Sequence, residues 1–284
     1  MGNAFTFLKA AVASLDRDLE YRDIQTTLCE TLQAYEQERI DYADQAIADL
    51  ACQKLLKNGD VILTFGNSQA VSAVLQLAKQ RQKNFSVIVV DSRPLLEGRD
   101  LLYELRKADI DCSYILLNAL TYVLQDVTKV LLGASALMSD GSIVGRVGSA
   151  CVALAAKAQH IPVLVCSETY KISNRVQLES ITNNELGDPE AIVHTCSLST
   201  VSSATDKEEK SPEATTTPTT KSSCECPLSN WKHGSSNLKL LNLTYDLTPA
   251  DFVSGIVTEL GIVPPTSVAV LLREMNPHDI RGLS

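Results

Sequence analysis

A glycine-rich stretch, Gly141–Gly148, is one segment of this chain that could bind a ligand. The residues that follow have helical spacing, and backbone amides at the start of a helix could cradle a phosphate group. The stretch has neither the G-x-G-x-x-G spacing of a dinucleotide site nor the Gly-Lys-Ser/Thr of a Walker A loop. Close packing of the helix on a sheet would explain the glycines just as well.

A second candidate is Asp91-Ser92-Arg93-Pro94, which ends an apolar run typical of a strand. The forked guanidinium group of Arg93 could bind a phosphate or a carboxylate there. The alternative is a structural ion pair between Arg93 and Asp91 or another acid. The sequence favours neither interpretation.

Cys224, Cys226 and His233 have the residue types of a zinc site, but one C-x-C pair falls short of the four ligands of a structural site. His160, His194 and His278 have no partner cysteine or serine at a recognisable spacing. We therefore expect no metal site, no catalytic histidine and no cofactor.

The elements that must position these residues begin with a helical region. Phe5, Leu8, Val12 and Leu15 recur at helical spacing. Asp23 is a plausible N-cap for a second helix, and a third should end at Asn58-Gly59. We expect an N-terminal helical domain over residues 1–56.

From Asp60 onward, short apolar runs rich in β-branched residues alternate with segments of helical spacing. This alternation predicts an α/β fold, a Rossmann-like, doubly wound and mostly parallel sheet, over residues 57–284. Ligand sites in such sheets lie at the carboxyl ends of the strands. The expected strands are 61–64, 85–90, 114–117, 129–132 and 162–165, with a further strand at 238–245 and a helix start at Thr248-Pro249.

Residues 197–223 are dominated by Ser and Thr, with two prolines. Such a segment cannot bury enough apolar surface to offset the entropy cost of ordering it. We expect a disordered insertion at about 197–236.

Bulk composition excludes some classes of function. The net charge of −9 disfavours nucleic-acid binding. No apolar run approaches the roughly 20 residues that span a bilayer, so we expect no membrane segment. The eight cysteines are scattered, mostly within apolar segments, which predicts reduced thiols and a cytosolic location.

The chain contains three long motifs, at residues 58–68, 89–98 and 129–148. These motifs resemble the initiation factor 2B alpha/beta/delta family, which also contains methylthioribose-1-phosphate isomerase and ribose-1,5-bisphosphate isomerase. Residues 162–171, 242–249 and 258–264 are similar to the delta-type members in particular. Those members carry a long basic extension before this region, so the chain is consistent with a truncated form.

The resemblance implies where the family's chemistry would lie. The isomerases carry a catalytic cysteine at the position of Gly66 and a catalytic aspartate at the position of Ser142. Isomerisation of a sugar needs a positioned acid or base, and neither residue supplies one here. We therefore expect a protein that is not an enzyme, with a vestigial phosphate-facing pocket formed by Gly66, Asn67, Asp91, Arg93, Asp140, Ser142 and Arg146.

By the same resemblance, the expected function is that of a non-catalytic regulatory subunit of the guanine-nucleotide exchange factor for initiation factor 2. Its partners would be the beta, alpha, gamma and epsilon subunits in a two-fold decamer, and initiation factor 2 with its phosphorylated alpha subunit. A sugar-phosphate isomerase, or a non-catalytic sensor of sugar phosphates or nucleotides, is the alternative. Residues of a subunit interface, or of ordinary core strands, would be Leu260, Ile262, Val263, Val270 and Leu272.

Overall fold

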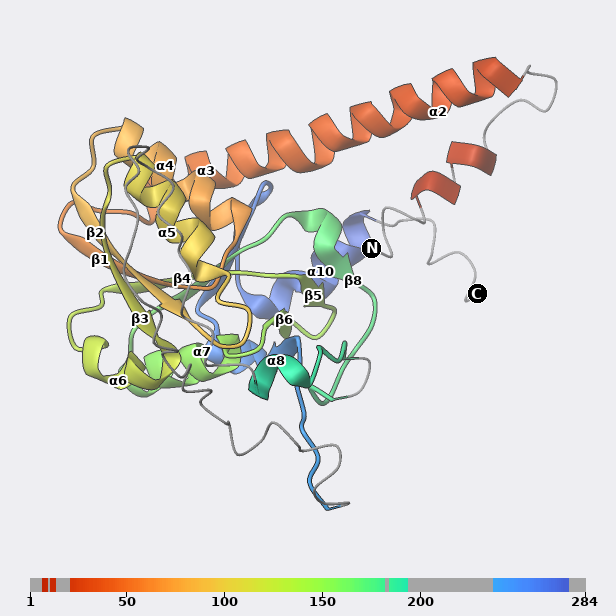
Figure 1. The fold of residues 1–284 in the computed structure, drawn as a ribbon. Helices are drawn as coiled ribbons and strands as arrows, with labels where there is room; N and C mark the ends of the chain where they lie inside the picture. Colours follow the sequence, from red (N-terminus) through yellow and green to blue (C-terminus); the bar gives the residue numbers. More distant parts are fainter. Residues whose placement is uncertain (1–6, 10, 14–20, 182–183, 194–236, 276–284) are drawn as a thin grey trace, which may run out of the picture. The chain divides into compact units, whose positions relative to one another are not determined.

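The computed structural model describes residues 7–9, 11–13, 21–181, 184–193 and 237–275 (Figure 1). The chain divides into two compact units, Met1–Glu185 with Leu243–Ser284, and Leu186–Asn242. The second unit contains one described helix, α8 (Glu190–Val193). The whole insertion expected at 197–236 lies outside the described residues.

A seven-stranded sheet in the order β11-β10-β7-β4-β1-β2-β3 lies at the centre of the first unit. Neighbouring strands run parallel, except for β11, which is antiparallel to β10. This arrangement confirms the predicted doubly wound, mostly parallel sheet. The strands are β1 (Asp60–Phe65), β2 (Phe85–Asp91), β3 (Asp111–Leu116), β4 (Lys129–Gly133), β7 (Val163–Cys166), β10 (Gly255–Thr258) and β11 (Gly261–Val263).

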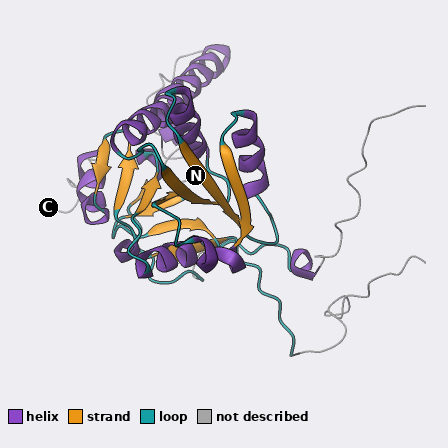
Figure 2. Cartoon of the chain, turned by 90° about the vertical axis from the view of Figure 1, so that its left-hand side faces the viewer, coloured by secondary structure: helices purple, strands orange, loops and turns teal. Residues whose placement is uncertain are grey.

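Helices cover both faces of the sheet (Figure 2). Successive strand residues point to opposite faces, so Ile62 packs with one helix layer and Leu63 with the other. The first layer consists of α3 (Tyr42–Lys54), α4 (Gln69–Gln80) and α5 (Gly98–Lys107). The second contains α6 (Leu120–Val123), α7 (Ser149–Ala158) and α10 (Val268–Met275). Burial on both faces explains why the strands are almost continuously apolar.

The N-terminal helices differ from the prediction. The second and third helices are continuous: α2 (Tyr21–Glu36) passes through a π-helical turn, Gln37–Asp41, into α3. No glycine or proline interrupts the chain there, so nothing in the local sequence breaks the helix. Asp23 lies in the first turn of α2 and not at its N-cap, and α3 ends at Lys54, before Asn58-Gly59.

A second, four-stranded sheet was not predicted. Its order is β8-β5-β6-β9, from β5 (Ala136–Met138), β6 (Ile143–Arg146), β8 (Ile172–Ser173) and β9 (Tyr245–Thr248). Half of the glycine-rich stretch forms strand β6. The backbone of β6 pairs with both β5 and β9. The strand expected at 238–245 was placed too early, since only Tyr245 belongs to β9. The helix start expected at Thr248-Pro249 is a single 3-10 turn, Ala250–Phe252.

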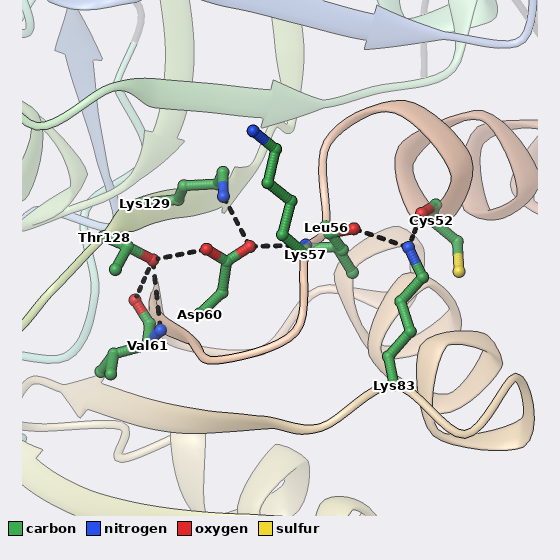
Figure 3. Close-up of polar contacts among 8 residues, drawn as sticks. All are labelled: Cys52, Leu56, Lys57, Asp60, Val61, Lys83, Thr128 and Lys129. Atoms are coloured by element: carbon green, nitrogen blue, oxygen red, sulfur yellow. Dashed lines mark hydrogen bonds and ion pairs between the residues drawn. The ribbon is translucent and has the colours of Figure 1, made fainter.

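Hydrogen bonds of Lys83 and Asp60 join the helical region to the amino ends of the strands (Figure 3). Lys83 Nζ donates to the carbonyl oxygens of Cys52 (2.5 Å) and Leu56 (2.6 Å), at the end of α3. Asp60, at the start of β1, accepts from the Lys57 amide (2.7 Å) and from Lys129 Nζ (2.5 Å). Burial by itself raises the pKa of Asp60, but the hydrogen bonds from Lys129 and the Lys57 amide bring it below its ordinary value. The loop between α3 and β1 is therefore held at both ends.

Candidate functional site

A cavity of about 350 Å³ opens at the carboxyl ends of β1 and β4, where the doubly wound fold predicts a ligand site. Segments far apart in the sequence meet there: the β1–α4 turn, the start of α5, the end of β4, the end of β6 and the turn after β7. The lining residues are Phe65, Asn67, Ser68, Gln69, Glu97, Asp100, Gly133, Ala134, Ser135, Gly145, Arg146, Ser149, Lys171 and Tyr245.

The turn after β1 shapes one wall of this cavity. Gly66 has φ +64°, a left-handed conformation that favours glycine, and its amide donates to the Val90 carbonyl oxygen at 2.9 Å. The chain thereby turns from the strand into Asn67 and Ser68 and then into α4. Ser68 packs directly against Gly133 of β4, where a side chain would collide with it. Gly66 thus provides the left-handed turn, and Gly133 makes room for Ser68 at the end of β4.

Each cationic side chain that lines the cavity has a carboxylate partner. Arg146 lies 2.6 Å from Glu97 and covers the ring of Tyr245 at 5.1 Å from its centre. Lys171 lies 2.6 Å from Glu168, which is 2% exposed. Asp100 adds a further carboxylate to the lining. The described lining therefore carries no excess of positive charge.

The helix start that could have cradled a phosphate is occupied by a side chain of the protein itself. Asp246 accepts hydrogen bonds from the amides of Gly148 (2.7 Å) and Ala150 (3.1 Å) at the start of α7. Burial raises the pKa of the Asp246 carboxyl, and the two amides partly oppose that rise. The Val147 amide donates to the Thr244 carbonyl oxygen. The glycines of this stretch thus serve strand pairing and the turn at Gly148, whose φ is +114°.

The expected pocket residues are only partly brought together. Asn67 and Arg146 line the cavity, and Gly66 adjoins it. Asp91 is buried and accepts from the Tyr114 hydroxyl at 2.9 Å, whereas Arg93 is exposed, and neither is among the lining residues. Asp140 and Ser142 bond to each other at 2.6 Å in the turn between β5 and β6, also outside the lining.

A carboxyl pair beside the cavity escaped the sequence reasoning. Asp44 of α3 faces Glu168, which follows β7, and burial together with the hydrogen bond to Glu168 raises the pKa of Asp44 to about 7. One oxygen of Asp44 is buried without a hydrogen-bond partner, whereas the buried Oε2 of Glu168 has the Lys171 ammonium group at 2.6 Å. Glu168 follows a strand end, which is a usable signal. Asp44 comes from a helix more than 100 residues earlier, and no sequence pattern links the two.

The described residues contain no group of three or more His, Cys, Asp or Glu that could hold a metal ion. None of the helices in the described part of the chain is long and apolar enough to cross a membrane. Cys224, Cys226 and His233 lie outside the described residues.

Comparison with known proteins places this geometry in context. The model of the "Initiation factor 2 subunit family" matches residues 1–265. "Translation initiation factor eIF2B subunit delta" of Dictyostelium discoideum is 38% identical over 274 residues, which is 96% of this chain and 40% of that protein. "Ribose 1,5-bisphosphate isomerase" of Pyrococcus furiosus is 28% identical over 221 residues, 78% of this chain and 58% of that enzyme. The chain therefore spans less than two thirds of the length of either relative.

Among solved structures, a chain of the tetrameric eIF2B beta2-delta2 complex from C. thermophilum matches with a TM-score of 0.68 and 27% sequence identity. The match covers 91% of this chain and 69% of that one. The similarity thus extends over most of the chain and over its helical and mostly parallel α/β architecture.

Proposed function

Because this chain belongs to the initiation factor 2 subunit family, we propose that it acts as a delta-type, non-catalytic regulatory subunit of the guanine-nucleotide exchange factor for translation initiation factor 2. The observation that carries this proposal is the 38% identity to a curated delta subunit over 96% of the chain. Identity to the isomerase is lower, at 28% over 78% of the chain.

The isomerase alternative is weakened by the two positions where the resemblance expects catalytic groups. Gly66 has no side chain, and Ser142 donates its hydroxyl to Asp140 in a turn outside the cavity lining. Proton transfer to and from a sugar needs an acid or base within hydrogen-bond reach of the reacting carbon. A serine held by a carboxylate in a different turn does not meet that requirement. The cavity itself favours a second candidate function, a non-catalytic sensor of a small ligand.

In the proposed role, the chain pairs with a beta subunit and assembles with alpha, gamma and epsilon subunits in a two-fold decamer in the cytosol. It contributes to sensing the phosphorylated alpha subunit of initiation factor 2, and it contacts neither nucleic acid nor membrane. The structure of a beta2-delta2 complex similar to this chain supports beta as the first partner.

The proposed interface residues differ in exposure, and this difference gives the experiment its control. Leu260 (63%), Ile262 (37%) and Val270 (47%) are exposed, as an interface requires. Val263 and Leu272 pack against the hydrophobic core. Val270 and Leu272 lie on α10, which is a helix and not the core strand weighed as the alternative for this segment.

The test is co-expression with a beta-type subunit, followed by size-exclusion chromatography with light scattering. We expect the chain alone to be poorly soluble or to self-associate, and the beta subunit to bring it into a defined complex, because lone proteins rarely expose wide apolar surfaces. Val270→Asp should weaken that complex at least tenfold and leave the melting temperature within a few degrees.

Leu272→Asp is the control, because it places a charge against the core and should destabilise the fold by about 2–4 kcal/mol. A stable monomer that does not bind the beta subunit would contradict the proposal. Turnover of ribose 1,5-bisphosphate by the purified chain would revive the enzyme alternative.

A further inference from the structure

The cavity at the carboxyl ends of β1 and β4 has charges that bear on which ligands it can accept. Its volume of about 350 Å³ falls within the range of small-molecule sites. Side chains with hydroxyl or amide groups make up much of the lining: Asn67, Ser68, Gln69, Ser135, Ser149 and Tyr245. Such groups can donate to and accept from the hydroxyl groups of a polyol.

Arg146 is the cation that a phosphate entering this cavity would need. Its guanidinium group, however, is held at 2.6 Å by Glu97, from the loop before α5, and one side of it faces the Tyr245 ring. The side chains of Arg146 and Glu97 are 35% and 30% exposed, so water screens this pair only in part. An anion could bind Arg146 only by displacing Glu97 or by approaching that carboxylate.

Lys171, the second cation of the lining, is engaged in the same way. Its ammonium group lies 2.6 Å from Glu168, whose side chain is almost fully buried. Glu97 and Asp100 also line the cavity, so a phosphate would meet two carboxylates of its own sign. Like charges brought together in a partly desolvated site discriminate strongly against a ligand.

We infer that Glu97 is a specificity-determining residue: as the built-in counterion of Arg146, it makes the cavity select uncharged polyhydroxyl ligands and exclude their phosphorylated forms. Glu168 has the same effect on Lys171. This inference concerns the cavity of this chain and does not rest on the proposed subunit role.

The test measures binding of ribose, ribose 5-phosphate and inorganic phosphate by titration calorimetry, using the full chain in the form in which it purifies. The unmodified chain should bind ribose 5-phosphate no more tightly than ribose. Glu97→Gln keeps the shape of the side chain, removes its charge and frees Arg146. That variant should bind ribose 5-phosphate and inorganic phosphate at least tenfold more tightly than the unmodified chain, with the affinity for ribose unchanged within twofold.

Asp49→Asn is the matched control. Asp49 pairs with Arg81 on the exposed surface of α3, so this substitution also removes one carboxylate and frees one arginine, but outside the cavity. It should leave all three affinities unchanged.

Three results would overturn the inference. The first is an unmodified chain that binds ribose 5-phosphate more tightly than ribose, which needs no variant to fold. The second is a folded Glu97→Gln variant with no gain for either phosphate compound. The third is an equal gain in Asp49→Asn, which would assign the effect to net charge alone.

Discussion

Asp44 and Glu168 form a pair of carboxyl groups with a shortage of positive charge around them. Lys171 is the cation that favours ionisation of Asp44, whereas Asp41 adds a further negative charge. The pair also raises the pKa of its neighbours: burial and then the charges of Glu168 and Asp44 raise that of the Cys166 thiol to about 12. Between about pH 4 and 7 the pair therefore retains a proton that an exposed aspartate would have lost.

Replacing Asp44 with Asn should flatten the dependence of stability on pH. The folded-state pKa of about 7 lies above the ordinary value of 3.8, so between about pH 4 and 7 the folded chain retains a proton that the unfolded chain releases. Stability contributed by this group is therefore greatest at low pH and is lost as the pH rises toward 7. Urea unfolding at pH 5.0 and 7.5 should show Asp44→Asn gaining about 1 kcal/mol relative to wild type at the higher pH, a value discounted for solvent screening.

The control is Asp49→Asn on the same helix, which should shift the urea curves by the same amount at both pH values. Its carboxylate is exposed and pairs with Arg81. If Asp44→Asn and wild type lose stability in parallel between pH 5.0 and 7.5, the shared proton is not present.

At the scale of elements, the end of α3 has backbone carbonyl groups that need hydrogen-bond donors from outside the helix. The last carbonyl groups of a helix have no partner within it. Here the Lys83 ammonium group, from the loop before β2, serves the carbonyls of Cys52 and Leu56. This side chain joins the helical region to the sheet across about 30 residues of sequence.

Lys83→Met should lower the free energy of unfolding by about 1–3 kcal/mol, since charged hydrogen bonds to partly buried carbonyls are lost. Lys54→Met is the matched control, because Lys54 is exposed in the last turn of the same helix. Its effect should stay within about 0.5 kcal/mol. Thermal and urea unfolding measure both, and equal effects would show that Lys83 acts only through its charge near the helix end.

At the scale of the whole molecule, the two positions that the resemblance assigns to catalysis adjoin strands of different sheets. Gly66 follows β1 of the large sheet, and Ser142 precedes β6 of the small one. Gly66→Cys combined with Ser142→Asp should not restore isomerase activity. Cysteine would have to adopt φ +64°, and an aspartate at 142 would face Asp140. Catalytic groups must be held to within roughly 0.5 Å by their surroundings.

A coupled assay for turnover of ribose 1,5-bisphosphate measures this outcome, with circular dichroism to verify folding. The control is Gly66→Ala combined with Ser142→Asn, which adds side chains of similar size without the thiol and the carboxylate. Activity above that control in the Cys/Asp variant would mean that the surroundings of the lost site persist.

The sequence was sufficient for five of the seven strands of the large sheet, but it predicted neither β10 nor β11, and it was insufficient for the small sheet. Runs such as Val87–Val90 are apolar because both faces of the strand are covered, and this signal is local. Strand β6 pairs with β9, about 100 residues later, and its glycines resemble a loop until that partner is known. The same limit applies to the cavity. Asn67 follows a strand end, so its place in the cavity could be predicted from the sequence. The role of Glu97 could not, because it depends on the contact with Arg146, which is 49 residues away.

Strand β1 has stabilising polar contacts at one end and the cavity at the other. Asp60 and its hydrogen-bond partners lie at the first residue of β1, and the cavity begins at its last residue, Phe65, roughly 17 Å away. Substitutions at one end therefore carry little penalty at the other. In evolutionary terms, a protein with this architecture can lose its catalytic side chains one at a time and remain folded at every step. Such a scaffold is ready to be recruited for assembly.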